Sequence, residues 1–233
     1  MRIGILETGF PPEELRETYG SYPEQFAKLL DGHGFEFKAW PVLTDDFPAS
    51  PADADGWLIT GSRFGVYEDH AWIPKLEAFV RQAVAARIPI VGICFGHQLL
   101  AQALGGKVIN SDRGWGVGPN DYRDLETGKT ITIVASHQDQ VVEQPPATEI
   151  IAESDFCPIA GLRWTDAPVI SWQPHPEMSK GFVTDLLKMR YGTTYPKDVA
   201  DKALARMEDP IDSPAMGDRI ARFFQENAAK AEA

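Results

Sequence analysis

The stretch Ile90-Val-Gly-Ile-Cys-Phe-Gly-His-Gln98 decides how the rest of this sequence is interpreted. Its first residues form a near-continuous apolar run, which is typical of a strand buried on both faces of a parallel sheet. A helix over about residues 96–105 follows, because Gly105-Gly106 is a helix stop signal. Cys94 lies between them in the pattern G-x-C-x-G. A strand that turns sharply into a helix at a nucleophilic residue, with small neighbours, is typical of a nucleophile elbow.

Outward from this segment, short apolar runs alternate with amphipathic stretches, which predicts an α/β fold: a doubly wound, mostly parallel sheet with flanking helices. After residue 106 the apolar runs follow one another with only loops between them, which predicts a β-rich extension after the nucleophile helix. The pattern over residues 178–228 predicts mostly helix, and therefore a helical C-terminal segment. The expected strands are residues 2–6, 35–40, 56–59, 88–93, 107–109, 130–134, 148–153, 159–164 and 168–172, and the other expected helices are 22–31 and 72–86.

The composition narrows the class of protein. Among 233 residues, 22 Lys+Arg against 34 Asp+Glu give a net charge of −12, which argues against nucleic-acid binding through a general basic surface. No run approaches the ~20 apolar residues of a membrane span, so no membrane association is expected. The start reaches Glu7 too soon for a signal peptide, and two cysteines outside any ligand cluster indicate a reducing compartment. We therefore expect a cytoplasmic protein, with one domain over 1–190 and a helical extension over 191–233 packed on it.

Cys94 is the candidate nucleophile. At a helix N-terminus it lies at the positive end of the helix dipole, which favours a thiolate. The amide of Phe95 would point into the same space as an oxyanion donor. The alternative is a small buried core cysteine. We assign Cys157, which has no such context, to that role.

His175 is the candidate base among five histidines. It directly follows the strand expected at 168–172, between two prolines that fix the backbone. Glu177, two residues on, can accept a hydrogen bond from the imidazole and orient it. His97 lies inside the nucleophile helix, where its side chain should point away from Cys94.

These segments resemble the class I glutamine amidotransferases, in particular the stand-alone, GMP synthase-like members. The resemblance covers residues 2–177 and follows the family's chain order. It rests on Gly92-Ile-Cys-Phe-Gly-His-Gln98 and Pro174-His-Pro-Glu177, and it is reinforced by Leu58-Ile-Thr-Gly-Ser62, Arg113-Gly-Trp-Gly116 and Ser136-His-Gln-Asp139.

The resemblance implies a role for each matching residue. Cys94 would be the nucleophile, His175 the base and Glu177 its orienter, and the amides of Phe95 and of Gly61 or Ser62 would form the oxyanion hole. Neither a metal nor another cofactor is implied. Along the bound glutamyl group we expect Gln98, Trp115, Gly116, Gln138 and Asp139.

The expected activity is cleavage of a γ-glutamyl amide, in glutamine or another γ-glutamyl compound, through a cysteine thioester. Two alternatives stay open: an ammonia-supplying subunit of a separate synthetase, and a catalytically silent binding or regulatory relative. The segment Glu7–Tyr22 follows the first strand, where loops surround the ligand crevice of an open sheet. It reads equally as a specificity loop or as a solvated surface loop.

Overall fold

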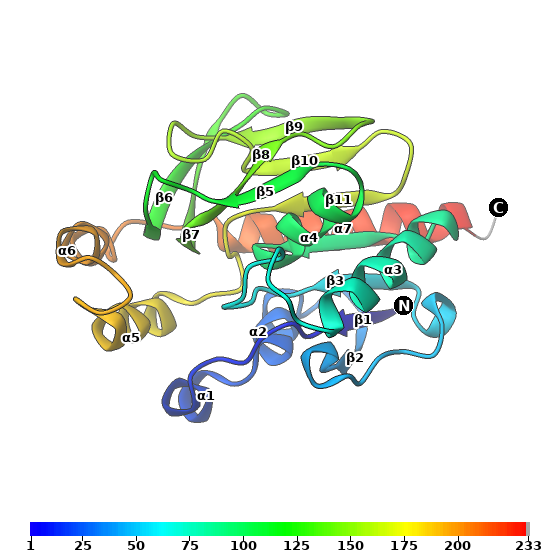
Figure 1. The fold of residues 1–233 in the computed structure, drawn as a ribbon, viewed down its shortest axis with the longest axis horizontal. Coiled ribbons are helices and arrows are strands. Elements are labelled where there is room, and N and C mark those ends of the chain that lie inside the picture. The colour runs from blue at the N-terminus through cyan, green and yellow to red at the C-terminus, as the bar shows by residue number, and fades with distance from the viewer. Residues whose placement is uncertain (232–233) are drawn as a thin grey trace.

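A nine-stranded mixed sheet forms the centre of the molecule (Figure 1). The computed structural model describes residues 1–231, with side chains described through Asn227. From one edge of the sheet to the other, the strands are β2 (Glu36–Trp40), β1 (Arg2–Leu6), β3 (Gly56–Ile59), β4 (Ile90–Ile93), β11 (Val169–Trp172), β10 (Gly161–Trp164), β9 (Thr148–Glu153), β6 (Gly116–Asp124) and β7 (Thr130–His137).

The two halves of this sheet differ in strand direction. The five strands from β2 to β11 run parallel, and the four from β10 to β7 pair antiparallel. A separate antiparallel pair, β5 (Lys107–Asn110) with β8 (Asp139–Glu143), lies beside the antiparallel half. The expected α/β sheet with a β-rich extension after the nucleophile helix is confirmed.

Helices cover both faces of the sheet. On one face α3 (Trp72–Ala85) and α4 (Phe95–Ala103) share a core cluster with sheet residues such as Trp57 and Ile59. On the other face α2 (Tyr22–Leu29) and α7 (Ser213–Ala231) pack with Ile3 and Ile5. The remaining helical segments are α1 (Glu13–Tyr19), α5 (Lys180–Arg190), α6 (Lys197–Ala205) and two single turns at Val42–Thr44 and Pro51–Asp53.

The C-terminal helices take part in the cores of the rest of the chain. Phe224 of α7 lies so close to β3 that a Cβ on Gly56 would meet its ring at 2.8 Å. A third cluster joins α5 and α6 to Val117 and Val134 of the antiparallel strands. The helical C-terminal segment is therefore confirmed, whereas the domain boundary between residues 190 and 191 stays a prediction. No helix within residues 1–231 combines the length and apolar character needed to cross a membrane.

Strands β6 and β8 and helix α1 were not expected from the sequence. Strand β6 contains Gly118, Pro119 and Asn120, residues typical of turns, yet it pairs with β7 along eight positions. Long-range pairing therefore overrides its weak strand propensity. Strand β8 pairs antiparallel with β5, and α1 occupies seven residues of the segment expected to be a loop.

Candidate active site

The turn from β4 into α4 holds Cys94 in a strained backbone conformation. Its φ is 53° and its ψ is −103°, in a region that costs a residue with a side chain about 1–3 kcal/mol. The flanking glycines are required by close approach. A Cβ on Gly92 would lie 2.5 Å from the carbonyl oxygen of Gly96, and one on Gly96 would lie 2.5 Å from that of Ile59. The strand–turn–helix geometry predicted from G-x-C-x-G is present.

Sheet pairing brings His175 to Cys94. Strand β11 runs parallel to β4 with Trp172 opposite Ile93, so the residues that follow the two strands emerge at the same sheet edge. The backbone N–H of His175 donates to the carbonyl of Val134 at 2.8 Å, which fixes the segment.

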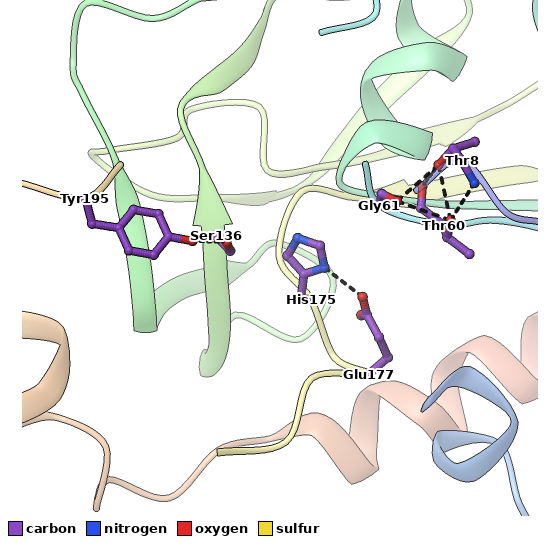
Figure 2. A network of polar contacts seen from close by, with 7 residues as sticks. All are labelled: Thr8, Thr60, Gly61, Ser136, His175, Glu177 and Tyr195. Carbon is purple, nitrogen blue, oxygen red and sulfur yellow. Dashed lines mark hydrogen bonds and ion pairs between the residues drawn. The ribbon is translucent and has the colours of Figure 1, made fainter. Parts of the chain in front are cut away.

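His175 is paired with Glu177, as the sequence predicts. The distance from His175 Nδ1 to Glu177 Oε1 is 2.7 Å, and the two side chains are 3% and 0% exposed (Figure 2). Because Nδ1 faces the carboxylate, Nε2 is the ring nitrogen left free to act elsewhere.

The pKa of His175 is set by its burial and by its two neighbours, Cys94 and Glu177. Burial alone would lower the pKa of His175, but the Cys94 sulfur and the Glu177 carboxylate outweigh it and raise that pKa well above its ordinary value. The Cys94 sulfur contributes both as a nearby charge and as a hydrogen-bond partner. The imidazole is thus stabilised in its protonated form beside the sulfur.

Gly61 lies directly against this pair. A Cβ built on it would fall 2.7 Å from His175 Cε1 and 3.6 Å from Cys94 Cβ. Its carbonyl accepts hydrogen bonds from the hydroxyls of Thr8 and Thr60, at 3.1 and 3.2 Å (Figure 2).

The hydrogen bonds from Thr8 and Thr60 to the Gly61 carbonyl orient the peptide between Gly61 and Ser62. Strand β3 lies between β1, which leads to Thr8, and β4, which leads to Cys94. In a trans peptide the N–H points opposite to the C=O. Because the Gly61 carbonyl points toward the Thr8 hydroxyl, the Ser62 N–H points away from that hydroxyl.

A cleft of about 680 Å³ opens over the sulfur. Most of the predicted site residues line it, and three do not. Phe95 is buried behind the elbow, Glu177 lies behind His175, and Gly116 is buried at the start of β6, where a Cβ would meet the ring of Phe156 at 2.4 Å. The predicted residues that line the cleft are Gly61, Ser62, Cys94, Gln98, Trp115, Gln138, Asp139 and His175.

Asp139 is tied into a polar network at one wall of the cleft. Its carboxylate accepts hydrogen bonds from Asn110 Nδ2 at 2.8 Å and from the Tyr67 hydroxyl at 3.0 Å. Its backbone carbonyl accepts from Gln98 Nε2 at 3.0 Å. Burial raises the pKa of Asp139.

Sequence reasoning missed Tyr67 and Asn110 as partners of this network. Each lies at the end of a strand or in a loop with no catalytic motif. Only their positions could have indicated that they belong to the site, because the loop after β3 and the end of β5 both border the cleft.

Cys157 is a core residue, as expected, and His97, which was expected to point away from Cys94, is also buried in the core. His97 is fully buried, with Nδ1 2.8 Å from Ser171 Oγ and Nε2 3.1 Å from the Ile159 carbonyl oxygen. Burial lowers its pKa to about 4, so it stays neutral. Cys157 is also fully buried, and burial raises its pKa to about 12.

The segment Glu7–Tyr22 borders the cleft at its two ends. Residues 9–13 and Tyr22 line it, and between them the chain forms α1. The segment is thus partly helical and not a loop throughout. Pro12 directly before Glu13 and Glu14 was a local helix-start signal.

The sequence of this chain is similar to a protein-family model and to known proteins. The family model described as "Glutamine amidotransferase class-I" matches residues 14–188. A glutamine amidotransferase-like protein of Schizosaccharomyces pombe is 29% identical, over 96% of this chain and 98% of that protein.

Two further similarities concern proteins with named activities. Gamma-glutamyl peptidase 4 of Arabidopsis thaliana is 28% identical, over 88% of this chain and 87% of that protein. A glutamine-hydrolyzing GMP synthase subunit of Methanopyrus kandleri is 30% identical, over 74% of this chain and 92% of that protein. Among solved structures, a glutamine amidotransferase from Methylobacillus flagellatus superposes with a TM-score of 0.77 at 23% identity, covering 99% of this chain and 94% of that one.

Proposed function

This chain belongs to the class-I glutamine amidotransferase family, and on that premise we propose that it hydrolyses a γ-glutamyl amide through a thioester on Cys94. The observation that carries the proposal is the buried 2.7 Å contact between His175 and Glu177, beside a cysteine held in a left-handed elbow. A base that is oriented by a third group and faces a nucleophile at a strand tip is the arrangement required for covalent acyl transfer.

In the first half-reaction the Cys94 thiolate attacks the γ-carbonyl carbon of the substrate. The tetrahedral oxyanion accepts hydrogen bonds from backbone amides, for which we propose those of Phe95 and Ser62. His175, protonated beside the sulfur, gives its proton to the leaving nitrogen. The C–N bond breaks, an amine or ammonia departs, and a glutamyl thioester remains.

In the second half-reaction water replaces the amine. His175, now neutral, takes a proton from the attacking water, and the C–S bond breaks. Glutamate leaves, and the proton on His175 restores the starting pair with the Cys94 thiolate. Glu177 stabilises the imidazolium in both halves without giving up its own charge.

We propose that the glutamyl group lies along the wall that contains Gln98, Trp115, Gln138 and Asp139, as the resemblance implies. The Asp139 carboxylate, whose pKa burial raises, lines this wall and offers an acceptor for a substrate ammonium group. Gly116 has no side chain and does not line the cleft, so it would act only through its backbone.

The substrate we favour is a γ-glutamyl compound larger than glutamine. The similarity to an Arabidopsis γ-glutamyl peptidase over most of both chains supports it. So does the size of the cleft, which extends from the triad to residues 9–13 and to α5.

A second candidate function is the supply of ammonia to a separate synthetase. The observation that favours it is the similarity to the Methanopyrus GMP synthase subunit, which extends over 92% of that protein. In that case the open side of the cleft would receive a synthetase chain.

Steady-state kinetics on the isolated chain separate these possibilities. Glutamine and a panel of γ-glutamyl dipeptides are the substrates, released glutamate is the readout, and Cys94→Ser is the blank. The peptidase proposal expects a kcat/KM for γ-glutamyl dipeptides well above that for glutamine. Turnover that appears only when a synthetase is added would favour the ammonia-supplying role, and binding without turnover under all conditions would favour a silent relative.

A further inference from the structure

Arg190, the last residue of α5, presents a half-buried cation to the cleft. Its Nη1 donates to the hydroxyl of Tyr195 at 3.1 Å. Among the side chains described through Asn227, no carboxylate oxygen lies within 4.0 Å of its guanidinium. In a chain with 34 acidic and 22 basic residues, a half-buried arginine without a carboxylate is an available site for an anion from outside the protein.

The arginine is held in place from two directions. Its carbonyl accepts the backbone N–H groups of Thr193 and Tyr195, at 3.2 and 3.1 Å, which closes the turn after α5. Its guanidinium lies over the Tyr195 ring, 5.6 Å from the centroid. The side chain is therefore positioned before any ligand arrives.

Tyr195 contacts both this arginine and Trp115, which lies in the wall proposed to bind the glutamyl group. Its hydroxyl lies 2.8 Å from Ser136 Oγ (Figure 2), and Trp115 packs edge-on against its ring at 5.0 Å. Tyr22, Arg190, Cys94 and His175 all line the same cleft. Burial raises the pKa of Tyr22, and the charges of Arg190, Glu177 and Cys94 all act on it. Arg190 is thus within the same cleft as the reacting sulfur.

We infer that Arg190 binds a carboxylate of the γ-glutamyl substrate, an inference that rests on the proposed function. The planar guanidinium presents paired N–H donors that match a carboxylate in bidentate geometry. Two carboxylates fit this chemistry: the α-carboxylate of the glutamyl residue, and the carboxylate of the amino acid that is released. Arg190 is a substrate-binding residue in either case.

The kinetic test compares three γ-glutamyl amino acids in the wild type, Arg190→Gln and Arg190→Lys. One carries both carboxylates free, one has the released amino acid amidated, and one has the glutamyl α-carboxylate amidated. We expect Arg190→Gln to lower kcat/KM for the free diacid by about 10- to 100-fold, mainly through KM, as a charged hydrogen bond implies. It should also abolish the wild-type preference for the free diacid over one of the two amides, which identifies the carboxylate bound.

Two variants complete this test. Arg190→Lys should retain part of the preference, because it keeps the charge but not the bidentate geometry. Lys188→Gln on the same helix, whose side chain is 66% exposed, should match the wild type. If Arg190→Gln discriminates among the three substrates as the wild type does, the inference is wrong, even where hydrolysis itself is confirmed.

A binding measurement separates failure of this inference from failure of the proposed function. Calorimetry with the free γ-glutamyl dipeptide compares Cys94→Ala with Cys94→Ala/Arg190→Gln. Binding weakened by about 10-fold or more in the double variant supports the inference, even if the wild type turns over no substrate. Equal affinity in the two variants, or no binding to either, overturns it.

Discussion

Replacing Gly61 with alanine should disable the site without removing any reacting group. The backbone of Gly61 is not in the left-handed region, so the peptide itself tolerates a side chain. The added Cβ, however, would lie 2.7 Å from His175 Cε1, whereas unstrained carbon–carbon contacts are about 3.5–4.0 Å. The imidazole would have to retreat by roughly 1 Å.

The surroundings of the ring leave it little freedom to retreat. The imidazole is held by the 2.7 Å contact with Glu177 and by the backbone bond to Val134. A misplacement of about 1 Å in an active site can cost ~10²-fold in rate. We therefore expect kcat/KM to fall by about 100-fold in Gly61→Ala.

Two measurements check this expectation. One is kcat/KM for a γ-glutamyl dipeptide, and the other is the rate at which a small alkylating agent modifies Cys94, which depends on the imidazole but not on substrate identity. Gly181→Ala is the matched control, because the three atoms nearest to its Cβ all belong to the Tyr19 side chain, from 3.1 Å outward. A folded Gly61→Ala protein with wild-type kinetics and alkylation would refute the reasoning.

Three further predictions follow from the site and its surroundings. Cys94→Ser should lose essentially all turnover while Cys157→Ser stays near wild type, and mass spectrometry after treatment with a glutamine-like alkylating agent should find the label on Cys94; label on Cys157 instead would contradict the assignment. His175→Ala should abolish activity, whereas Glu177→Gln should keep a residue of it, with kcat/KM lowered by about 10- to 150-fold for the ~1.5–3 kcal/mol of a charged hydrogen bond; equal loss in both would show that Glu177 does more than orient the base. Burial raises the pKa of Glu7 from 4.5 to about 7, so the folded protein holds this proton while the unfolded chain releases it, and stability is lost as pH rises from 4.5 to 7. Glu7→Gln should therefore gain about 5–10 °C in Tm relative to wild type between pH 5 and pH 8, for a linkage of ~2.5 kcal/mol at ~2–4 °C per kcal/mol in a chain of this size. A Tm difference that does not change with pH would show that Glu7 stays charged.

Local sequence was sufficient for the parts of the site that are local in the structure. The elbow at Cys94 follows from a buried strand, two glycines and a helix within nine residues. The contact of His175 with Glu177 joins residues two positions apart, on a backbone stiffened by prolines. Hydrophobic periodicity and turn-forming residues act over such short separations in the sequence, so a sequence pattern is enough to predict these features.

The tertiary structure decided which residues the Cys94 elbow and the His175–Glu177 pair contact. The parallel pairing of β4 with β11 places Cys94 beside His175, and hydrogen bonds from Thr8 and Thr60 hold the Gly61 carbonyl. The partners of the Asp139 carboxylate, Tyr67 and Asn110, likewise come from segments far away in the chain.

The difference between local and long-range effects also explains why the sequence did not predict strand β6. Strand β6 has the composition of a turn, and its propensity says nothing about the eight pairs that β7 supplies. A residue's own sequence neighbourhood fixes its preferred local conformation, but the free energy of long-range pairing and burial chooses among those preferences. The sequence by itself therefore determined the strand–turn–helix elbow at Cys94 and the pair His175–Glu177, and the packing of the sheet decided that Cys94 and His175 share one cleft.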